Sequence, residues 1–354
     1  MKKPIFSMFL IFAFIVLGCA KSDSKPKQID IFVGIEGLTA EFAKSAPPPR
    51  VFENSKFPIL LRVRNKGTYG IASDGQTFGV LSIGREKDYI TRLSLEKSSR
   101  TFQAIEGEEA NEIFFSVDGK TQLNPKGDEI VVSLNAKTGK LEPQSEIKPS
   151  TITATLCYPY QTVLSTTVCI DPDPAGIRPG KKVCNVKESS YNNGQGAPIS
   201  VTKIEPQMIP EGEFIKPQFL IFIENKGKGN TVDIKSYDNV CGKNLDFDDP
   251  KRKEEIKNIW NVAFLRAYAS GEKDINQLIC CPNIDGQCPE QETNVNKITG
   301  FVRFRDRKDF VRCTFKNGVG KNFDAYTSPL RIEIDYGYVQ TVATNFIIQK
   351  PIRY

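Results

Sequence analysis

The sequence predicts an all-β protein with two tandem antiparallel β-sandwich domains, the second of which contains a short helical, cysteine-bearing insertion. Short β-rich runs such as "FGVLSIG" (78–84) and "EIVVSLN" (129–135) follow one another closely, separated by turn residues and not by regular helical segments. Several motifs occur twice in the same order. The length of 354 residues is sufficient for two domains with their own cores.

The first repeated motif is a strand that ends in Asn-Lys-Gly. Residues 57–67, "FPILLRVRNKG", and residues 217–227, "PQFLIFIENKG", align at an offset of 160. Alternate positions are apolar in both, which indicates a half-buried strand. We expect a turn at each Asn-Lys-Gly, because Asn tolerates a positive φ and Gly adopts one readily.

The second repeated motif closes each copy. Residues 157–170, "CYPYQTVLSTTVCI", align without a gap with residues 335–348, "DYGYVQTVATNFII", at an offset of 178. Alternating apolar residues precede both segments, so a pair of final strands is predicted in each copy. Two matches in the same order favour an internal duplication. The matched tyrosines are Tyr158 with Tyr336 and Tyr160 with Tyr338.

A third, weaker match pairs residues 86–88 with residues 272–274. Its offset of 186 implies that the second copy has 26 additional residues, which we place within about 228–260. This insertion contains Cys241 and a helix start at the Asp-Pro pair 249–250. A short helix is therefore expected in the insertion.

The predicted domains follow from the repeat. The first sandwich covers residues 29–170, and the second covers residues 199–354. Between them, residues 171–198 are rich in Pro and Gly, which indicates a linker or a long loop. Within the second copy, residues 261–269 have two interpretations. The apolar spacing of Ile256, Ile259, Trp260, Ala263 and Phe264 fits a continuing helix, whereas the repeat alignment predicts a strand directly after a short helix, which we favour.

Residues 1–18 predict an export signal, because a basic start precedes an apolar run shorter than the roughly 20 residues of a membrane-spanning helix. The run ends in Val-Leu-Gly-Cys at 16–19, which resembles the lipobox of prokaryotic lipoproteins. The resemblance implies that the chain is cut before Cys19, that the Cys19 thiol bears a diacylglycerol, and that residues 19–28 form a flexible spacer. The alternative is an uncleaved anchor helix. Both place the protein at the cell membrane, facing the extracytoplasmic side.

The other eight cysteines predict disulfides. Their number is even, and export exposes them to an oxidising compartment, where disulfides persist. We expect four bridges, although the sequence does not choose among the many possible pairings. The alternative is a zinc site formed by the last four cysteines, whose spacing fits zinc ligands poorly. The disulfide candidates are Cys157, Cys169, Cys184, Cys241, Cys280, Cys281, Cys288 and Cys313.

The composition argues against catalysis. The chain has no histidine, which removes the commonest general base and metal ligand, and it contains no nucleophile-elbow or phosphate-loop motif. We therefore expect no enzymatic activity, no cofactor and no metal, while a spatial pair of carboxylates for glycoside hydrolysis stays an open alternative. The formal charge of +6 is modest and basic residues alternate with acidic ones, so no nucleic-acid partner is expected. The acidic clusters at Asp171/Asp173 and Asp246/Asp248/Asp249 favour solvated loops or helix caps over calcium ligation.

The strands that end in Asn-Lys-Gly resemble those of immunoglobulin-like, adhesion-type modules of prokaryotic cell-surface proteins. The Cys-Tyr-x-Tyr strand, together with the pairing of two modules, is similar to archaeal surface lipoproteins. The resemblance implies two tandem immunoglobulin-like sandwiches over residues 29–354 and a non-catalytic binding or structural role at the cell surface. The implied partners are membrane lipid, through Cys19, and a surface protein or a glycan.

Two alternatives stay open at this point. Tyrosines two residues apart share one side of a strand, where they either line a glycan-binding face or, as we favour, form a packed stripe. The residues concerned are Tyr158, Tyr160, Tyr336 and Tyr338. The alternative function is a lipid-anchored solute-binding component of a transport system, but it requires an α/β body with a cleft, and long amphipathic helices are scarce in this sequence.

Overall fold

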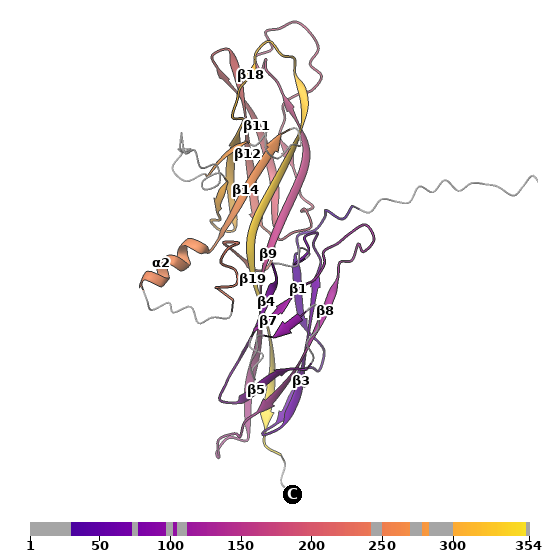
Figure 1. Ribbon diagram of the computed structural model, residues 1–354, viewed down its shortest axis with the longest axis vertical. Helices are drawn as coiled ribbons and strands as arrows, with labels where there is room; N and C mark the ends of the chain where they lie inside the picture. The colour runs from indigo at the N-terminus through magenta and orange to yellow at the C-terminus, as the bar shows by residue number, and fades with distance from the viewer. Residues whose placement is uncertain are drawn as a thin grey trace, which may run out of the picture. The chain divides into compact units, whose positions relative to one another are not determined.

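A computed structural model describes residues 30–72, 77–96, 102–104, 112–241, 250–269, 278–282 and 300–351 (Figure 1). As the sequence predicts, the secondary structure is mostly β, in antiparallel sheets, with a single helix in these ranges. The predicted signal segment and Cys19 lie outside the described residues. Among the residues that are described, no helix combines the length and apolar character that crossing a membrane requires.

The first sheet comes from the first copy of the repeat. Its strands, in spatial order, are β1 (Leu38–Phe42), β3 (Lys56–Asn65), β8 (Glu129–Thr138) and β5 (Ile90–Leu95). Neighbouring strands are antiparallel. Buried and less buried side chains alternate along β3 because one face of the strand packs into the core. The strand ends at Asn65, as the first repeated motif predicts.

The second sheet is built in the same way from the second copy. Its strands are β10 (Ser189–Ser190), β11 (Ile199–Glu211), β12 (Phe214–Asn225), β17 (Lys308–Thr314) and β15 (Ile279–Pro282), with β18 (Val319–Gly320) also paired to β12. Leu38 of β1 pairs with Asn65, and Ile199 of β11 pairs with Asn225. The strands β11 and β12 therefore repeat the pairing of β1 and β3, and Asn65 and Asn225 are related by the predicted offset of 160.

A third sheet, the shared sheet, contains strands of both copies. Its strands, in order, are β16 (Phe301–Arg303), β14 (Val262–Ala269), β19 (Tyr326–Gln349), β9 (Ile147–Ile170), β4 (Gly79–Arg85), β7 (Glu112–Phe115) and β6 (Phe102–Ala104). Two further strands, β13 (Asn230–Val232) and β2 (Arg50–Phe52), also pair with β19. Only the pairing of β2 with β19 is parallel among these described strands.

The longest ladder joins β9 and β19, which pair antiparallel over 24 residues each (Figure 1). Pro159 pairs with Gly337 near the middle, and repeat-equivalent residues cross-pair around this point. An approximate two-fold axis therefore passes through the Pro159–Gly337 pair. The prediction of two final strands per copy is wrong, because each is one continuous strand. The first half of β9 lies beside β4, and the first half of β19 lies beside β14, each within its own copy. The second half of each strand continues past the axis.

One hydrophobic core joins the three sheets. Phe57 of β3 contacts Phe346 in the second half of β19, with ring centroids 5.3 Å apart. In the second copy, Thr162 of β9 donates a hydrogen bond to the Ile199 carbonyl of β11 over 2.8 Å. The shared sheet is therefore the opposite layer for both other sheets, in a sandwich-like arrangement. Each layer pair includes a half-strand from the other copy, and residues from Ile31 onward form one compact unit.

The second copy contains the expected helix and strand. The helix α2 covers Pro250–Ile259, and β14 begins at Val262. Strand pairing places Val80 opposite Cys157 and Phe264 opposite Asp335, so Val80 and Phe264 are equivalent, 184 residues apart. The offset between β4 and β14 is therefore 184 and not 186, while the third sequence match itself is not tested because residues 272–274 lie outside the described residues.

The segment before α2 covers the outer face of the shared sheet. Val240 and Cys241 are buried there against Cys157 and Val339, next to partly buried Trp260. The Tyr237 hydroxyl donates a hydrogen bond to the Phe78 carbonyl over 2.7 Å. The insertion of the second copy thus binds to the first copy, which further joins the two halves.

Candidate functional site

Four buried tyrosines meet where β9 and β19 cross the two-fold axis. Their ring centroids are 5.7 to 6.2 Å apart around a closed cycle, in tilted or edge-to-face contacts. None of the four is more than 1% exposed. We refer to them as the tyrosine quartet, which consists of Tyr158, Tyr160, Tyr336 and Tyr338.

Two members of the quartet bind the ends of the repeated strands. Tyr160 donates a hydrogen bond to the side-chain oxygen of Asn65 over 3.1 Å, and Tyr338 donates to that of Asn225 over 3.2 Å. The Asn65 amide donates to the Tyr69 carbonyl, and the Asn225 amide donates to the carbonyl four residues further on in the same way. The repeated Asn therefore connects a turn to the quartet through buried hydrogen bonds, an arrangement that we call the bracket.

The other two members bind the neighbouring strands. The backbone N–H of Leu38 donates to the Tyr158 hydroxyl over 3.3 Å, and that of Ile199 donates to the Tyr336 hydroxyl over 3.4 Å. The Tyr336 hydroxyl also lies 3.0 Å from the Thr162 hydroxyl. All four phenol groups thus have hydrogen-bonding partners within the protein, as buried hydroxyls require.

Burial excludes the quartet from ligand binding. It raises the pKa of all four phenols, that of Tyr338 to about 12, because the ionised form loses its hydration. A glycan cannot contact rings that are removed from the surface, so the assignment of Tyr158, Tyr160, Tyr336 and Tyr338 to a glycan-binding face is wrong. The packed stripe favoured by the sequence is what forms.

The quartet also explains the repeated Gly. Neither Gly67 nor Gly227 has a positive φ, so the expected reason for glycine is wrong. A Cβ at Gly67 would lie within 3 Å of the Tyr160 hydroxyl and of the Glu36 carbonyl, and a Cβ at Gly227 would collide with the Tyr338 hydroxyl in the same manner. Glycine is required because the tyrosine approaches the backbone closely.

Disulfides join the predicted cysteines as the sequence leads one to expect. Cys157 bonds to Cys241 across 84 residues, and thereby ties the insertion to β9. Cys169 bonds to Cys184 across 15 residues, and Cys280 bonds to Cys313 between β15 and β17. Because the thiols of Cys280 and Cys313 form a disulfide, they cannot bind zinc, and the alternative zinc site does not form.

The two remaining disulfide candidates are Cys281 and Cys288. Cys281 is also disulfide-bonded, whereas Cys288 lies outside the described residues. In the part of the chain that the structure describes, no group of His, Cys, Asp or Glu side chains is arranged to hold a metal ion.

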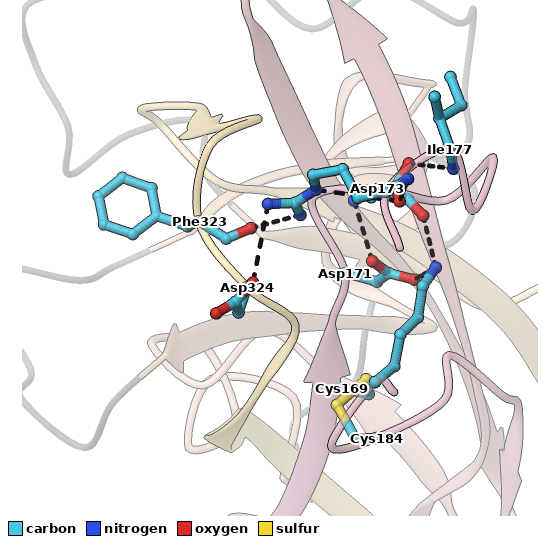
Figure 2. A network of polar contacts seen from close by, with 9 residues as sticks. Cys169, Asp171, Asp173, Ile177, Cys184, Phe323 and Asp324 are labelled. Carbon is cyan, nitrogen blue, oxygen red and sulfur yellow. Dashed lines mark hydrogen bonds and ion pairs between the residues drawn. A yellow bond between two sulfur atoms is a disulfide. The ribbon is translucent and has the colours of Figure 1, made fainter. Parts of the chain in front are cut away.

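The loop closed by Cys169 and Cys184 contains the first acidic cluster (Figure 2). Asp171 accepts a hydrogen bond from Lys182 Nζ over 2.6 Å. Asp173 accepts the backbone N–H groups of Ile177 and Arg178 over 3.0 and 2.9 Å. These two N–H groups hold the pKa of the Asp173 carboxyl below its usual range.

The same loop reaches the segment after β18. The Arg178 guanidinium donates to the Phe323 carbonyl over 2.6 Å and lies 3.7 Å from the Asp324 carboxylate (Figure 2). The carboxylates of Asp171 and Asp173 are thus occupied by groups of their own loop, which agrees with the structural interpretation favoured over calcium. The second acidic cluster, at residues 246–249, lies outside the described residues.

A groove of about 740 Å³ lies beside β1, and we call it the β1 groove. It lies between β1, the Lys226–Lys228 turn and residues 340–342 of β19. Its volume falls in the range of ligand clefts. Five basic side chains line it, against three acidic ones. The basic residues are Arg62, Arg64, Lys66, Lys226 and Lys228, and the acidic residues are Glu36, Glu41 and Glu129.

The sequence reasoning did not identify the β1 groove, although part of the signal was present. Arg62 and Arg64 alternate with apolar residues in "FPILLRVRNKG", which places them on the outward face of the predicted strand. The repeated Asn-Lys-Gly motif supplies Lys66 and Lys226. Only the fold brings both repeats of this motif to one groove, on the outside of the turns whose buried Asn residues bind the quartet.

Comparisons with known proteins give little further information. No protein-family model and no curated protein matches the chain. Among solved structures, it is similar to the C-terminal domain of the Streptococcus agalactiae AgI/II polypeptide BspA, at 9% identity and a TM-score of 0.22, over 88% of this chain and 100% of that chain. The C-terminal domain of the Streptococcus pyogenes antigen I/II-family protein AspA gives 8% identity and a TM-score of 0.22, over 90% of this chain and 100% of that one. Scores this low support no argument about function.

Proposed function

We propose that the protein is a lipid-anchored, non-catalytic binding module of the cell surface, built from two immunoglobulin-like halves that share one sheet, and that it faces the extracytoplasmic side of the membrane. The observation that supports binding is the β1 groove, in which basic side chains gather beside a strand edge. Such a groove offers directional hydrogen-bonding groups and an excess of positive charge, which suit recognition of a macromolecular surface.

The cysteines support the proposed location. Disulfides persist outside the reducing cytosol, and described pairs such as Cys157–Cys241 are closed here. The Val-Leu-Gly-Cys segment at 16–19 supplies the proposed anchor, because two acyl chains bind a bilayer far more firmly than one. No observation favours the alternative of a transport component.

The anchor is tested by Cys19→Ser in the full chain, with Ala20→Ser as a matched control. We expect the wild type and Ala20→Ser to be in the membrane fraction, with a lipid mass on Cys19, and to be cut by protease added to intact cells. Cys19→Ser should retain residues 1–18 and lose the lipid. A Cys19→Ser chain that is processed and anchored like the wild type contradicts the proposal.

The binding role is tested with the full chain purified in detergent and labelled with a fluorophore. We expect it to bind to the surface of cells that lack the protein, and we expect the triple variant Arg64→Glu/Lys226→Glu/Lys228→Glu to lose this binding. A matched triple variant on exposed residues outside the groove, Arg92→Glu/Lys137→Glu/Lys140→Glu, should bind like the wild type. Equal binding by all three proteins would contradict a role of the β1 groove.

A further inference from the structure

We propose that the β1 groove binds an extended acidic segment of another protein, which adds to the open edge of β1 as a further strand. This inference rests on the proposed binding function and names its ligand class. Three observations support it: the direction of the β1 backbone groups, the covering of the equivalent edge in the second copy, and the groove cations that form no ion pair with a described residue.

The strand β1 has one partner among the described strands, β3. At its ends, the Gly37 carbonyl accepts from Lys66 N–H and the Ala43 N–H donates to the Leu60 carbonyl. Because backbone groups of an antiparallel strand alternate in direction, Thr39 and Glu41 face β3, whereas Ala40 and Phe42 face away from it. The Leu38 N–H, which bonds to Tyr158, agrees with this alternation.

In the second copy the equivalent edge is covered by polypeptide. Val201 occupies the place of Ala40, since Val201 pairs with Ile223 and Ala40 pairs with Val63. The Gln195 side chain accepts from the Val201 N–H over 2.9 Å and donates to the Val201 carbonyl over 3.2 Å.

Further along the same edge, β10 pairs with Lys203 and Ile204 of β11. The residues of β1 that occupy those two places are Glu41 and Phe42. A strand and an amide side chain therefore complete the edge of β11. In the first copy, no described residue hydrogen-bonds to the outward N–H or carbonyl of Ala40. The duplication thus indicates what kind of group fits this edge, namely polypeptide backbone.

The charges of the groove select an acidic segment. Lys66 lies 3.3 Å from Glu36, and Arg62 lies 3.9 Å from Glu41, so these two cations have carboxylate neighbours. The remaining three, Arg64, Lys226 and Lys228, form no ion pair with a described residue.

Among these cations, Arg64 gives the most direct evidence for a missing hydrogen-bond acceptor. Its Nε atom is buried and has no hydrogen-bond partner among the described residues. The Arg64 side chain lies on the same face of the sheet as that of Thr39, its pairing partner in β1. A carboxylate on an added strand would supply the missing acceptor and would also satisfy the turn lysines.

The probe is a fluorescein-labelled, end-capped peptide of sequence Val-Asp-Val-Glu-Val-Asp, titrated into the full chain in detergent with fluorescence anisotropy as the readout. Two peptides serve as controls. The first has the same sequence with N-methyl groups on alternate amides, which keeps the charge and prevents strand addition. The second replaces Asp and Glu by Asn and Gln, which keeps the backbone and removes the charge.

We expect both control peptides to bind at least about tenfold more weakly than the parent peptide. Arg64→Gln should weaken the parent peptide by about tenfold, whereas Arg92→Gln, at an exposed position in β5 of the same sheet, should leave its affinity unchanged within about twofold. Hydrogen exchange of residues 38–43 should slow when the parent peptide binds the wild type. These measurements need no variant of β1 that risks misfolding.

Several results would overturn the inference. These are equal binding of the N-methylated peptide, an unchanged affinity in Arg64→Gln, or no binding of the parent peptide up to about 1 mM. Self-association of the chain through β1, or selective binding of an acidic polysaccharide in place of the peptide, would also overturn it. Groove-dependent binding to intact cells without peptide binding would reject strand addition and leave the proposed function standing. Binding of the parent peptide by the wild type without groove-dependent binding to intact cells would reject the proposed function instead.

Discussion

The Tyr160 hydroxyl donates a hydrogen bond to the buried Asn65 side chain over 3.1 Å, and so links the last strand of the first copy to the turn after β3. Asn65 also accepts the Gly67 N–H and donates to the Tyr69 carbonyl. The same bracket recurs between Tyr338 and Asn225. A duplicated chain has thus kept a polar pair at the centre of its core, where each unsatisfied partner would be costly.

Asn65→Ala should destabilise the protein strongly. The substitution removes three hydrogen bonds from a fully buried position and leaves polar groups there without partners, each at a cost of about 1–3 kcal/mol. We expect a decrease of at least about 2 kcal/mol in the free energy of unfolding, measured by urea titration with a soluble form of the chain. Asn192→Ala, at an exposed position, is the control and should change it by less than about 0.5 kcal/mol. Similar values for both variants would show that the bracket is unimportant for stability.

Gly67→Ala should be destabilising because of the Tyr160 hydroxyl and not because of its φ. The added Cβ would meet that hydroxyl first, and then the carbonyls of Gly196 and Glu36. Removing the hydroxyl in the double variant Gly67→Ala/Tyr160→Phe should therefore recover part of the loss. We expect the two effects to be non-additive by about 0.5 kcal/mol or more in urea unfolding. Strict additivity would mean that the collision with Tyr160 does not determine the choice of glycine.

Local strand patterns could be predicted from the sequence, because alternation of apolar residues depends only on which face of a strand is buried. The segments at 57–67 and 217–227 became β3 and β12, and the strand predicted at 261–269 became β14. The crossing of β9 and β19 could not be predicted, since pairing between strands so distant in sequence depends on the whole fold. Their alternation was visible, but the continuation of each through Pro159 or Gly337 was not.

The candidate site was less accessible to sequence reasoning. The alternation of Arg62 and Arg64 could be seen, whereas the open edge beside them could not. What distinguishes Ala40 from Val201 is a single amide side chain, Gln195, that reaches back over the edge of β11. A sequence motif does not reveal such a tertiary contact. The same holds for the disulfide partners and for the buried position of the quartet.

The disulfide between Cys157 and Cys241 should contribute more stability than that between Cys169 and Cys184. Loop-closure entropy increases with the number of residues enclosed, and 84 residues against 15 corresponds to a difference of about 1.5 kcal/mol. The first bridge is also fully buried beneath the insertion. We expect the double variant Cys157→Ala/Cys241→Ala to lower the unfolding midpoint further than Cys169→Ala/Cys184→Ala. The reverse order in thermal unfolding would contradict this account.

Alkaline pH should unfold the protein through the quartet. Free phenols ionise near pH 10, whereas the pKa of Tyr338 is raised to about 12 and those of Tyr158, Tyr160 and Tyr336 are raised as well. Between these pH values the unfolded chain has lost protons that the folded chain still holds. The stability that the neutral phenols contribute is therefore complete below about pH 10 and is lost as the pH rises through the folded pKa values.

In a pH titration followed by tyrosinate absorbance, ionisation of the quartet should be visible as a separate, late step at high pH. Of the eleven tyrosines, the four of the quartet should ionise only at the pH where the near-ultraviolet circular dichroism of the fold disappears. Tyr158→Phe should reduce the amplitude of that late step by one tyrosine. If all eleven ionised reversibly near pH 10 with the circular dichroism intact, the quartet would have to be accessible to solvent, contrary to its burial between the sheets.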